Sequence, residues 1–281
     1  MKIALLTLAG LVLAPLAGGL LAGVDRKVTA WLQSRKGPPI IQPFYDLIKL
    51  FAKEKLAVNP WQVLCAWVYL MAAVFSVVLF FNQADLLLLF FVQAVGAVFL
   101  VMGALSVPSP YSQVGAQREL LQVLTYEPLL MLVFVGIYQV TGSFRISSVL
   151  DHPRPLLLEL PLLYLVLTYA LTIKLRKSPF DFSTSHHAHQ ELVRGVLTEY
   201  SGPFLGLVEL AHWYETVLIL GLCALFWATS VPGMAILLGA TYFLELLVDN
   251  TMARMTWRWM LRYVWTVGLV LAFTNLLWLH L

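Results

Sequence analysis

Long runs of apolar residues without any charge recur along this chain, and short polar segments separate them. An α-helix needs about 20 predominantly apolar residues to cross the hydrocarbon core of a bilayer, and these runs are close to that length or longer. The pattern predicts an all-α integral membrane protein with about eight transmembrane helices, which form a single polytopic membrane domain over residues 1–281. The expected spans are Ile3–Val24, Leu56–Ala84, Leu86 to about Val107, a fourth that ends near Gly142, Leu156–Lys174, Pro203–Thr229, a seventh that ends near Asp249, and Tyr263–Leu281.

Composition excludes the other broad classes of protein. Hydrophobic residues make up 60% of the chain and charged residues only 12%, whereas about 25% of an ordinary soluble domain is charged. A soluble globule of this composition would lack the polar residues to cover its surface, and a disordered chain could not keep so much apolar surface solvated. The formal net charge of +3 is small, and we expect no nucleic-acid partner.

The two cysteines, Cys65 and Cys223, both lie within apolar runs. Two thiolates alone cannot hold an iron–sulfur cluster, because such clusters take four protein ligands. We therefore expect no cofactor in this chain, and we expect electrons to travel through partner subunits.

The basic residues are divided unequally between the two sets of connecting segments. Of the 18 Lys and Arg residues, all but Lys2, Arg145 and Arg154 fall after spans one, three, five and seven. Because Lys and Arg collect on the cytoplasmic side, we expect both termini to lie on the outer side of a prokaryotic cytoplasmic membrane. The first run has its basic residues after it rather than before it, which argues against a cleaved signal peptide. The expected cytoplasmic docking segments are 25–60, 108–127, 175–202 and 250–262.

An amphipathic pattern follows the Gly37-Pro38-Pro39 turn in the first cytoplasmic segment. Apolar residues at helical spacing occupy one face and charged residues the other. The pattern predicts a short helix, which is either an interfacial helix at the lipid headgroups or a platform for a peripheral subunit. The apolar face comprises Phe44, Leu47, Ile48 and Phe51. The candidate docking residues are Gln42, Asp46, Lys49, Lys53 and, from the third segment, Arg194.

Three histidines stand close together in the third cytoplasmic segment, at positions 186, 187 and 189. They suggest zinc, but no cysteine is near them, and a closed zinc site needs four ligands. Histidines that titrate near neutral pH beside Glu191 and Glu199 fit a proton-handling loop better.

Ionisable residues in or beside the spans are expensive in a membrane and are functional candidates for that reason. Glu209, His212 and Glu215 share one face of the sixth predicted helix, and Glu245 and Asp249 form an i,i+4 pair on the seventh. Such a row can move protons, or its members can be structurally paired. The candidate relay and coupling residues are Arg118, Glu119, Glu127, Asp181, His189, Glu191, Glu199, Glu209, His212, Glu215, Glu245 and Asp249.

Three blocks, taken together and in this order, resemble the H-subunit family of NADH–quinone oxidoreductase (respiratory complex I) and its relatives in membrane-bound hydrogenases. The resemblance covers nearly the whole chain. The residues that carry it are Gly37, Gln42-Pro43, Asp46, Lys49 and Lys53-Glu54; Gly115, Arg118, Gln122 and Tyr126-Glu127; and Pro179-Phe180-Asp181, Glu191-Leu192-Val193, Gly195 and Glu199-Tyr200-Ser201-Gly202.

Departures from the quinone-reducing pattern indicate the hydrogenase branch. His189 and His212 stand where the quinone-reducing members have glutamates, and the segment after Pro-Phe-Asp is longer. The stretch from Asp249 to Arg254 is similar to formate hydrogenlyase and energy-converting hydrogenases. The resemblance therefore implies a noncatalytic membrane-anchor and proton-coupling subunit of a complex I-like, ion-translocating nickel–iron (NiFe) hydrogenase.

The same resemblance implies a set of partners. They are the hydrogenase small and large subunits and a ferredoxin-like subunit, which would carry the iron–sulfur clusters and the NiFe centre, together with antiporter-like membrane subunits in the lipid bilayer. The first alternative is a quinone-site subunit of an NADH– or ferredoxin–quinone oxidoreductase. The second is an independent secondary transporter, against which stand the long charged loops and the lack of an internal repeat.

Overall fold

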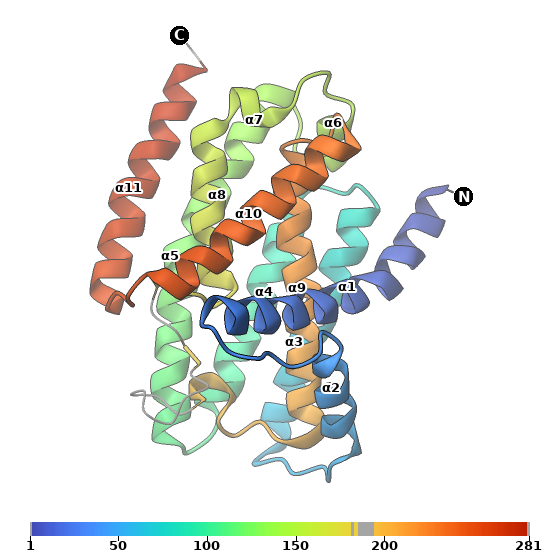
Figure 1. Ribbon diagram of the computed structural model, residues 1–281, viewed down its shortest axis with the longest axis vertical. Coiled ribbons are helices and arrows are strands. Elements are labelled where there is room, and N and C mark those ends of the chain that lie inside the picture. Colours follow the sequence, from blue (N-terminus) through green and yellow to red (C-terminus); the bar gives the residue numbers. More distant parts are fainter. Residues whose placement is uncertain (1, 181–182, 185–193, 280–281) are drawn as a thin grey trace. The chain divides into compact units, whose positions relative to one another are not determined.

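The computed structural model describes residues 2–180, 183–184 and 194–279, and the regular structure in these ranges is helical (Figure 1). An isolated bridge between Asp85 and Arg145 accompanies the helices. The prediction of an all-α integral membrane protein is confirmed. The helices are α1 (Lys2–Leu32), α2 (Gln42–Ala52), α3 (Pro60–Phe81), α4 (Leu86–Leu105), α5 (Pro110–Thr141), α6 (Ile146–Leu150), α7 (Leu156–Glu159), α8 (Pro161–Lys174), α9 (Gly202–Leu225), α10 (Val231–Thr251) and α11 (Trp257–Trp278), with a 3₁₀ turn, η1 (Gly195–Leu197), before α9.

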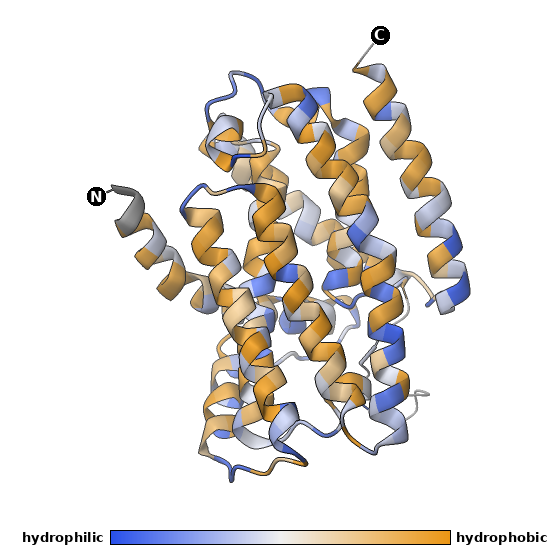
Figure 2. Cartoon of the chain, turned by 180° about the vertical axis from the view of Figure 1, so that it is seen from behind, coloured by the Kyte–Doolittle hydropathy of each residue, from blue (hydrophilic) through white to orange (hydrophobic). Residues whose placement is uncertain are grey.

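Seven helices within the described ranges are long and apolar enough to cross a membrane, and α8 is a shorter apolar helix. Large apolar side chains are exposed along them; Ile236, for example, is 72% exposed and Val270 is 65% exposed. Most residues of the long helices are coloured as hydrophobic in Figure 2. Lipid can cover such surfaces, whereas water could not do so without a large free-energy cost.

Several observed helices begin or end a few residues away from the predicted spans, and two differ more. The first helix does not end at Val24 but continues to Leu32, so part of the predicted first docking segment is helical. The fifth predicted span is divided at Leu160 into α7 and α8. Pro161 explains the division, because proline disfavours the helical conformation of the residue that precedes it, and Leu160 has φ −122° and ψ 46°.

The chain divides into two compact units, each assembled from three segments. α4, α5 and α9 each contribute to both units. The prediction of one polytopic membrane domain over residues 1–281 stays a prediction. Unit 1 comprises Met1–Asn82, Phe90–Leu120 and Phe182–Leu218, and unit 2 comprises Gln83–Leu89, Leu121–Asp181 and Ile219–Leu281.

In unit 1, α1 packs against α3 and also contacts α2. The segment before α2 passes so close to α1 that a Cβ atom on Gly23 would collide with the backbone carbonyl of Ile40. Only glycine therefore fits at position 23. The ring of Phe44 in α2 lies edge-on to Trp213 of α9, with 5.2 Å between centroids. These contacts hold α2 against the spanning helices.

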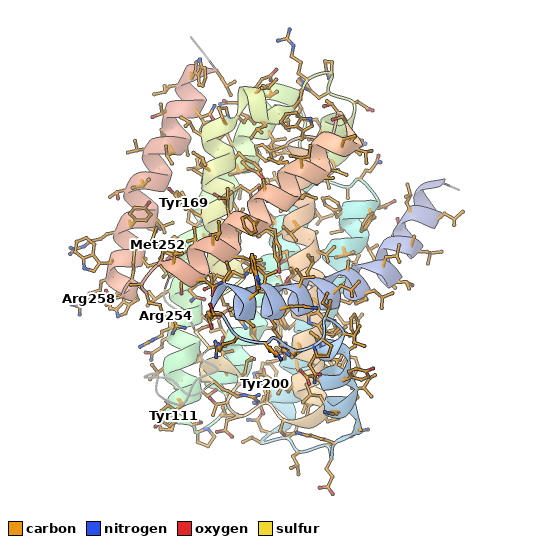
Figure 3. The ribbon with its side chains drawn as sticks, viewed as in Figure 1. Tyr111, Tyr169, Tyr200, Met252, Arg254 and Arg258 are labelled. Carbon is orange, nitrogen blue, oxygen red and sulfur yellow. The ribbon has the colours of Figure 1, made fainter. Side chains whose placement is uncertain are left out.

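In unit 2, α11 lies beside α8 (Figures 1 and 2). The hydroxyls of Tyr169 in α8 and Tyr263 in α11 lie 3.4 Å apart; Tyr169 is labelled in Figure 3. At the other end of α8, the Asn275 side chain accepts hydrogen bonds from the backbone N–H groups of Leu162 and Leu163 at 2.9 and 3.1 Å. Asn275 thus satisfies amide groups that the break before Pro161 leaves without a helical acceptor.

Candidate functional site

A buried carboxyl in α9 is bound by a tyrosine from α3 in unit 1. Tyr69 donates a hydrogen bond of 2.6 Å to Glu215 Oε2, and the two residues are 2% and 6% exposed. His212 and Glu209, the other relay candidates of this helix, lie about one turn and two turns earlier in α9 and are half-buried. Sequence reasoning missed Tyr69, since a single tyrosine in an apolar run gives no sign of its partner.

The second predicted docking segment, 108–127, lies almost entirely within α5, which runs without a break from Pro110 to Thr141. Arg118, Glu119 and Glu127 are half-buried along it. Glu119 accepts a hydrogen bond from the Ser183 hydroxyl, which ties this helix to the segment that precedes η1.

Further along α5, in unit 2, a lysine approaches Tyr126, the residue before Glu127. Lys174, the last residue of α8, places Nζ 5.7 Å from the ring centroid of Tyr126. A cation over an aromatic face is stabilised by the ring's quadrupole. Lys174 was counted in the basic asymmetry but was missed as a member of this group.

The relay candidates of α10 face α8 within unit 2. Glu245 is 5% exposed, and its Oε1 accepts a hydrogen bond of 2.8 Å from the Thr172 hydroxyl. Asp249, one turn later, accepts a hydrogen bond of 2.8 Å from the backbone N–H of Ser178. Lys177 is 5% exposed and its Nζ lies 5.1 Å from the ring centroid of Tyr242.

The third segment is described only in part. Asp181, His189 and Glu191 lie outside the described residues, as do the other two histidines of the cluster. Glu199 is described and is half-buried. Among the described residues no group of three His, Cys, Asp or Glu is placed to hold a metal ion. The zinc alternative for the histidine cluster therefore stays open.

The predicted docking helix exists as α2, and an ion pair joins it to α1. Arg26 lies 2.7 Å from Asp46, which also accepts a 3.0 Å hydrogen bond from Gln42. Burial opposes ionisation of the Asp46 carboxyl, but the hydrogen bonds from Arg26 and Gln42 outweigh it and lower the pKa below its ordinary value. Lys49 is exposed on the same helix. Arg26 was missed because the first span was expected to end before it.

The predicted apolar face of α2 is in part packed and in part exposed. Phe44 packs on Trp213, whereas Ile48 is 64% exposed and lies on the same side as the exposed Ile41 and Tyr45. The choice between an interfacial helix and a platform for a peripheral subunit stays a prediction.

A pocket of about 510 Å³ lies beside α2 in unit 1. Lys53 and Arg194, two of the docking candidates, are among its lining residues, with Glu54 and Tyr200. Tyr200 (Figure 3) is 2% exposed, and burial raises the pKa of its hydroxyl. The pocket brings together residues from two predicted docking segments that are separated by about 140 positions in the chain.

A family model described as NADH dehydrogenase matches residues 3–280. The chain belongs to this NADH dehydrogenase family. The resemblance drawn from the three sequence blocks is confirmed. Hydrogenase-4 component C of Escherichia coli (strain K12) is 31% identical over 230 residues, which make up 76% of this chain and 70% of that protein. Formate hydrogenlyase subunit 4 of the same organism is 30% identical over 210 residues, 68% of this chain and 66% of that protein.

A solved structure shares the fold of the whole chain. A chain of the membrane-bound sulfane sulfur reductase, described as an archaeal respiratory membrane complex, superposes with a TM-score of 0.87 at 21% sequence identity, covering 99% of this chain and 100% of that one. This likeness shows that the two chains share one helical fold. Members of the family belong to multisubunit membrane-bound respiratory or hydrogenase complexes.

Proposed function

We propose that this chain is the membrane-anchoring and proton-coupling subunit of a complex I-like, ion-translocating membrane-bound NiFe hydrogenase. The observation that carries the proposal is the family match over residues 3–280, together with the hydrogenase and formate hydrogenlyase relatives at 31% and 30% identity. Redox cofactors would reside in partner subunits, as iron–sulfur clusters and the NiFe centre. Both termini would lie on the outer side of a prokaryotic cytoplasmic membrane.

The peripheral redox subunits would dock on the cytoplasmic segments 25–60, 108–127, 175–202 and 250–262. Exposed cations at two of these segments support this part of the proposal. Lys49 and Lys53 lie on and just after α2, and Arg254 and Arg258 lie before and at the start of α11 (Figure 3). An antiporter-like subunit would contact the spanning helices.

Coupling would be electrostatic. A change of one unit of charge a few ångströms away is worth several kcal/mol at an intermediate dielectric, and 1.36 kcal/mol corresponds to one pKa unit. Reduction of a nearby cluster would therefore change the protonation of Glu127, Glu191 and Glu199. The proton would then pass to Glu209, His212 and Glu215. The hydrogen bond from Tyr69 supports this role for Glu215, because a hydroxyl at 2.6 Å holds the buried carboxyl in one position and can itself exchange a proton with it.

Replacement of Glu215 tests the proposal directly. In proteoliposomes of the purified complex, Glu215→Gln is expected to lower hydrogen-coupled proton translocation by on the order of a hundredfold, the usual effect of removing a positioned proton-transfer group. Dye-linked hydrogenase activity of the same preparation should stay at the wild-type level, because the redox chemistry lies in other chains. Asp151→Asn, at an exposed carboxyl after α6, is the matched control. Wild-type translocation by Glu215→Gln would refute the role of this residue.

The family's description as NADH dehydrogenase supports the second candidate, a quinone-site subunit of an NADH– or ferredoxin–quinone oxidoreductase. The two proposals predict different reactions for the purified complex. A hydrogenase complex evolves or consumes hydrogen in the absence of quinone, whereas an oxidoreductase of the second kind reduces quinone and evolves no hydrogen.

A further inference from the structure

Three polar contacts join α8 and the residues after it to α10 inside unit 2. We call the residues that form them the α8–α10 ladder. The contacts connect Tyr164 Oη with Thr241 Oγ1 at 2.6 Å, Thr172 Oγ1 with Glu245 Oε1 at 2.8 Å, and the Ser178 backbone N–H with Asp249 Oδ1 at 2.8 Å.

The ladder is regular on α10, where its residues recur about once per helical turn. Thr241, Glu245 and Asp249 lie at i, i+4 and i+8 and form one stripe along α10, about 12 Å long at a rise of 1.5 Å per residue. Tyr164 and Thr172 are eight residues apart on α8 and form the facing stripe. Neighbours at i,i+4 have Cβ atoms about 5–6 Å apart, a separation that two side chains or one intervening water can bridge.

Packing alone does not explain these residues. All of the hydroxyls and carboxyls named lie in apolar helices, where each polar group has an energetic cost that a leucine or valine would avoid. Thr172, Thr241 and Glu245 are each about 95% buried. A regular polar stripe in this environment is typical of a path for a small ion or a proton.

Glu245 has a feature that sets it apart from a structural hydrogen-bond acceptor. Its Oε1 is bound by Thr172, but its Oε2 is buried and has no hydrogen-bond partner among the described residues. A buried carboxylate oxygen without a partner is costly, and protonation at that oxygen removes the charge that causes the cost. The buried Lys177 lies in the same unit, just after α8, and supplies a positive charge when the carboxyls are ionised.

We propose that the α8–α10 ladder is a proton path, separate from the Tyr69–Glu215 pair, in which Glu245 is the residue that holds the proton. This proposal rests on the proposed function in one respect: the redox reaction of the complex supplies the free energy that moves the proton. Asp249, which is half-buried near the end of α10, receives a proton first. Glu245 then takes the proton at Oε2 and leaves Asp249 ionised. Thr241 accepts the proton from Glu245 as its own hydroxyl proton passes to Tyr164, and the hydroxyl proton of Tyr164 passes to a water molecule. The net result is the movement of one proton and no electron.

The experiment uses the purified complex in proteoliposomes, with three readouts: dye-linked hydrogenase activity, hydrogen-coupled proton translocation, and the infrared difference spectrum. For Glu245→Gln, translocation is expected to fall by on the order of a hundredfold at unchanged dye-linked activity. The carbonyl stretch of a protonated carboxylic acid should disappear from the difference spectrum. Glu245→Asp should restore part of both signals, a result that a purely structural carboxyl would not give.

Variants at the Thr241 hydroxyl test the proposal if the Glu245→Gln complex does not assemble. Thr241→Val is expected to slow translocation, and Thr241→Ser to retain it. Thr274→Val is the matched control, since Thr274 lies on the exposed side of α11 and donates only to its own helix, to the Val270 carbonyl at 2.7 Å. Wild-type translocation by Glu245→Gln, or by Thr241→Val if the Glu245→Gln complex does not assemble, would overturn the proposal. A wild-type complex that translocates no protons would instead refute the proposed function.

Discussion

At the scale of single residues, backbone conformation at Arg194 and Gly195 decides how the end of the third cytoplasmic segment is attached to unit 1. Both residues have positive φ, 57° and 47°. A Cβ atom at Gly195 would collide with the Ser183 carbonyl, which accepts a hydrogen bond of 3.2 Å from Val196 N. On the other side, a Cβ atom at Gly115 would collide with the same backbone. Glycine is therefore required twice where this segment meets α5.

Gly195→Ala is expected to destabilise this attachment by about 1–3 kcal/mol, because alanine at positive φ is strained and its Cβ has no room. The measurement is limited proteolysis of the segment 183–200 in the purified complex, which should become faster than in wild type. Gly239→Ala is the control: Gly239 lies in α10 with open space around the added Cβ, and alanine there should leave the proteolysis rate unchanged. Equal rates for Gly195→Ala and wild type would contradict this account.

At the scale of elements, the break between α7 and α8 is stabilised by a residue more than a hundred positions away. Asn275 is fully buried in α11; it accepts from Leu162 and Leu163 and donates to the Glu159 carbonyl at 3.0 Å. One amide side chain thus satisfies groups on both sides of Pro161. α8 has only 14 residues, so its position depends on this contact and on its packing against α11.

Asn275→Leu keeps the approximate volume but removes all three hydrogen bonds. Each buried polar group left without a partner costs about 1–3 kcal/mol, so the thermal midpoint of the detergent-solubilised protein should fall by several degrees. The comparison variant is Thr274→Val, at the neighbouring exposed position. An unchanged midpoint for Asn275→Leu would mean that packing alone holds the break.

At the scale of the whole molecule, the proposed function requires a peripheral arm on the cytoplasmic segments. Lys49 and Lys53 are exposed, and Lys53 lines the pocket that it shares with Arg194. Charges of this kind at an interface affect association more at low than at high ionic strength, because salt screens exposed charges over about 10 Å at 0.1 M.

Reversal of these charges by Lys49→Glu with Lys53→Glu is expected to release hydrogenase activity from washed membranes into the supernatant, most clearly at low salt, by roughly tenfold relative to wild type (a loss of about 1.4 kcal/mol). The measurement is the share of dye-linked activity that sediments with the membranes. Arg154→Glu, an exposed cation in a segment predicted to lie on the outer side, is the control and should release no activity. Release by the control variant to the same extent would contradict the predicted orientation or the docking face.

Much of this architecture could be predicted from the chain alone. The apolar runs predict the spanning helices because the requirement for about 20 apolar residues is local and one-dimensional. Helical periodicity also places Glu245 with Asp249 on one face of α10. The boundaries could not be predicted in the same way: the end of α1 and the break at Leu160 depend on a charged turn that stays helical and on a proline whose effect tertiary contacts reinforce.

The sequence by itself determined the membrane class, the approximate spans, the family and which ionisable residues share a helix. Only the tertiary structure decided which partner each of them has. Tyr69 meets Glu215, Thr172 meets Glu245 and Asn275 caps α8 across separations of 146, 73 and at least 112 residues. Periodicity describes the faces of one helix, whereas these pairs depend on how two helices cross and on the rotation of each about its axis.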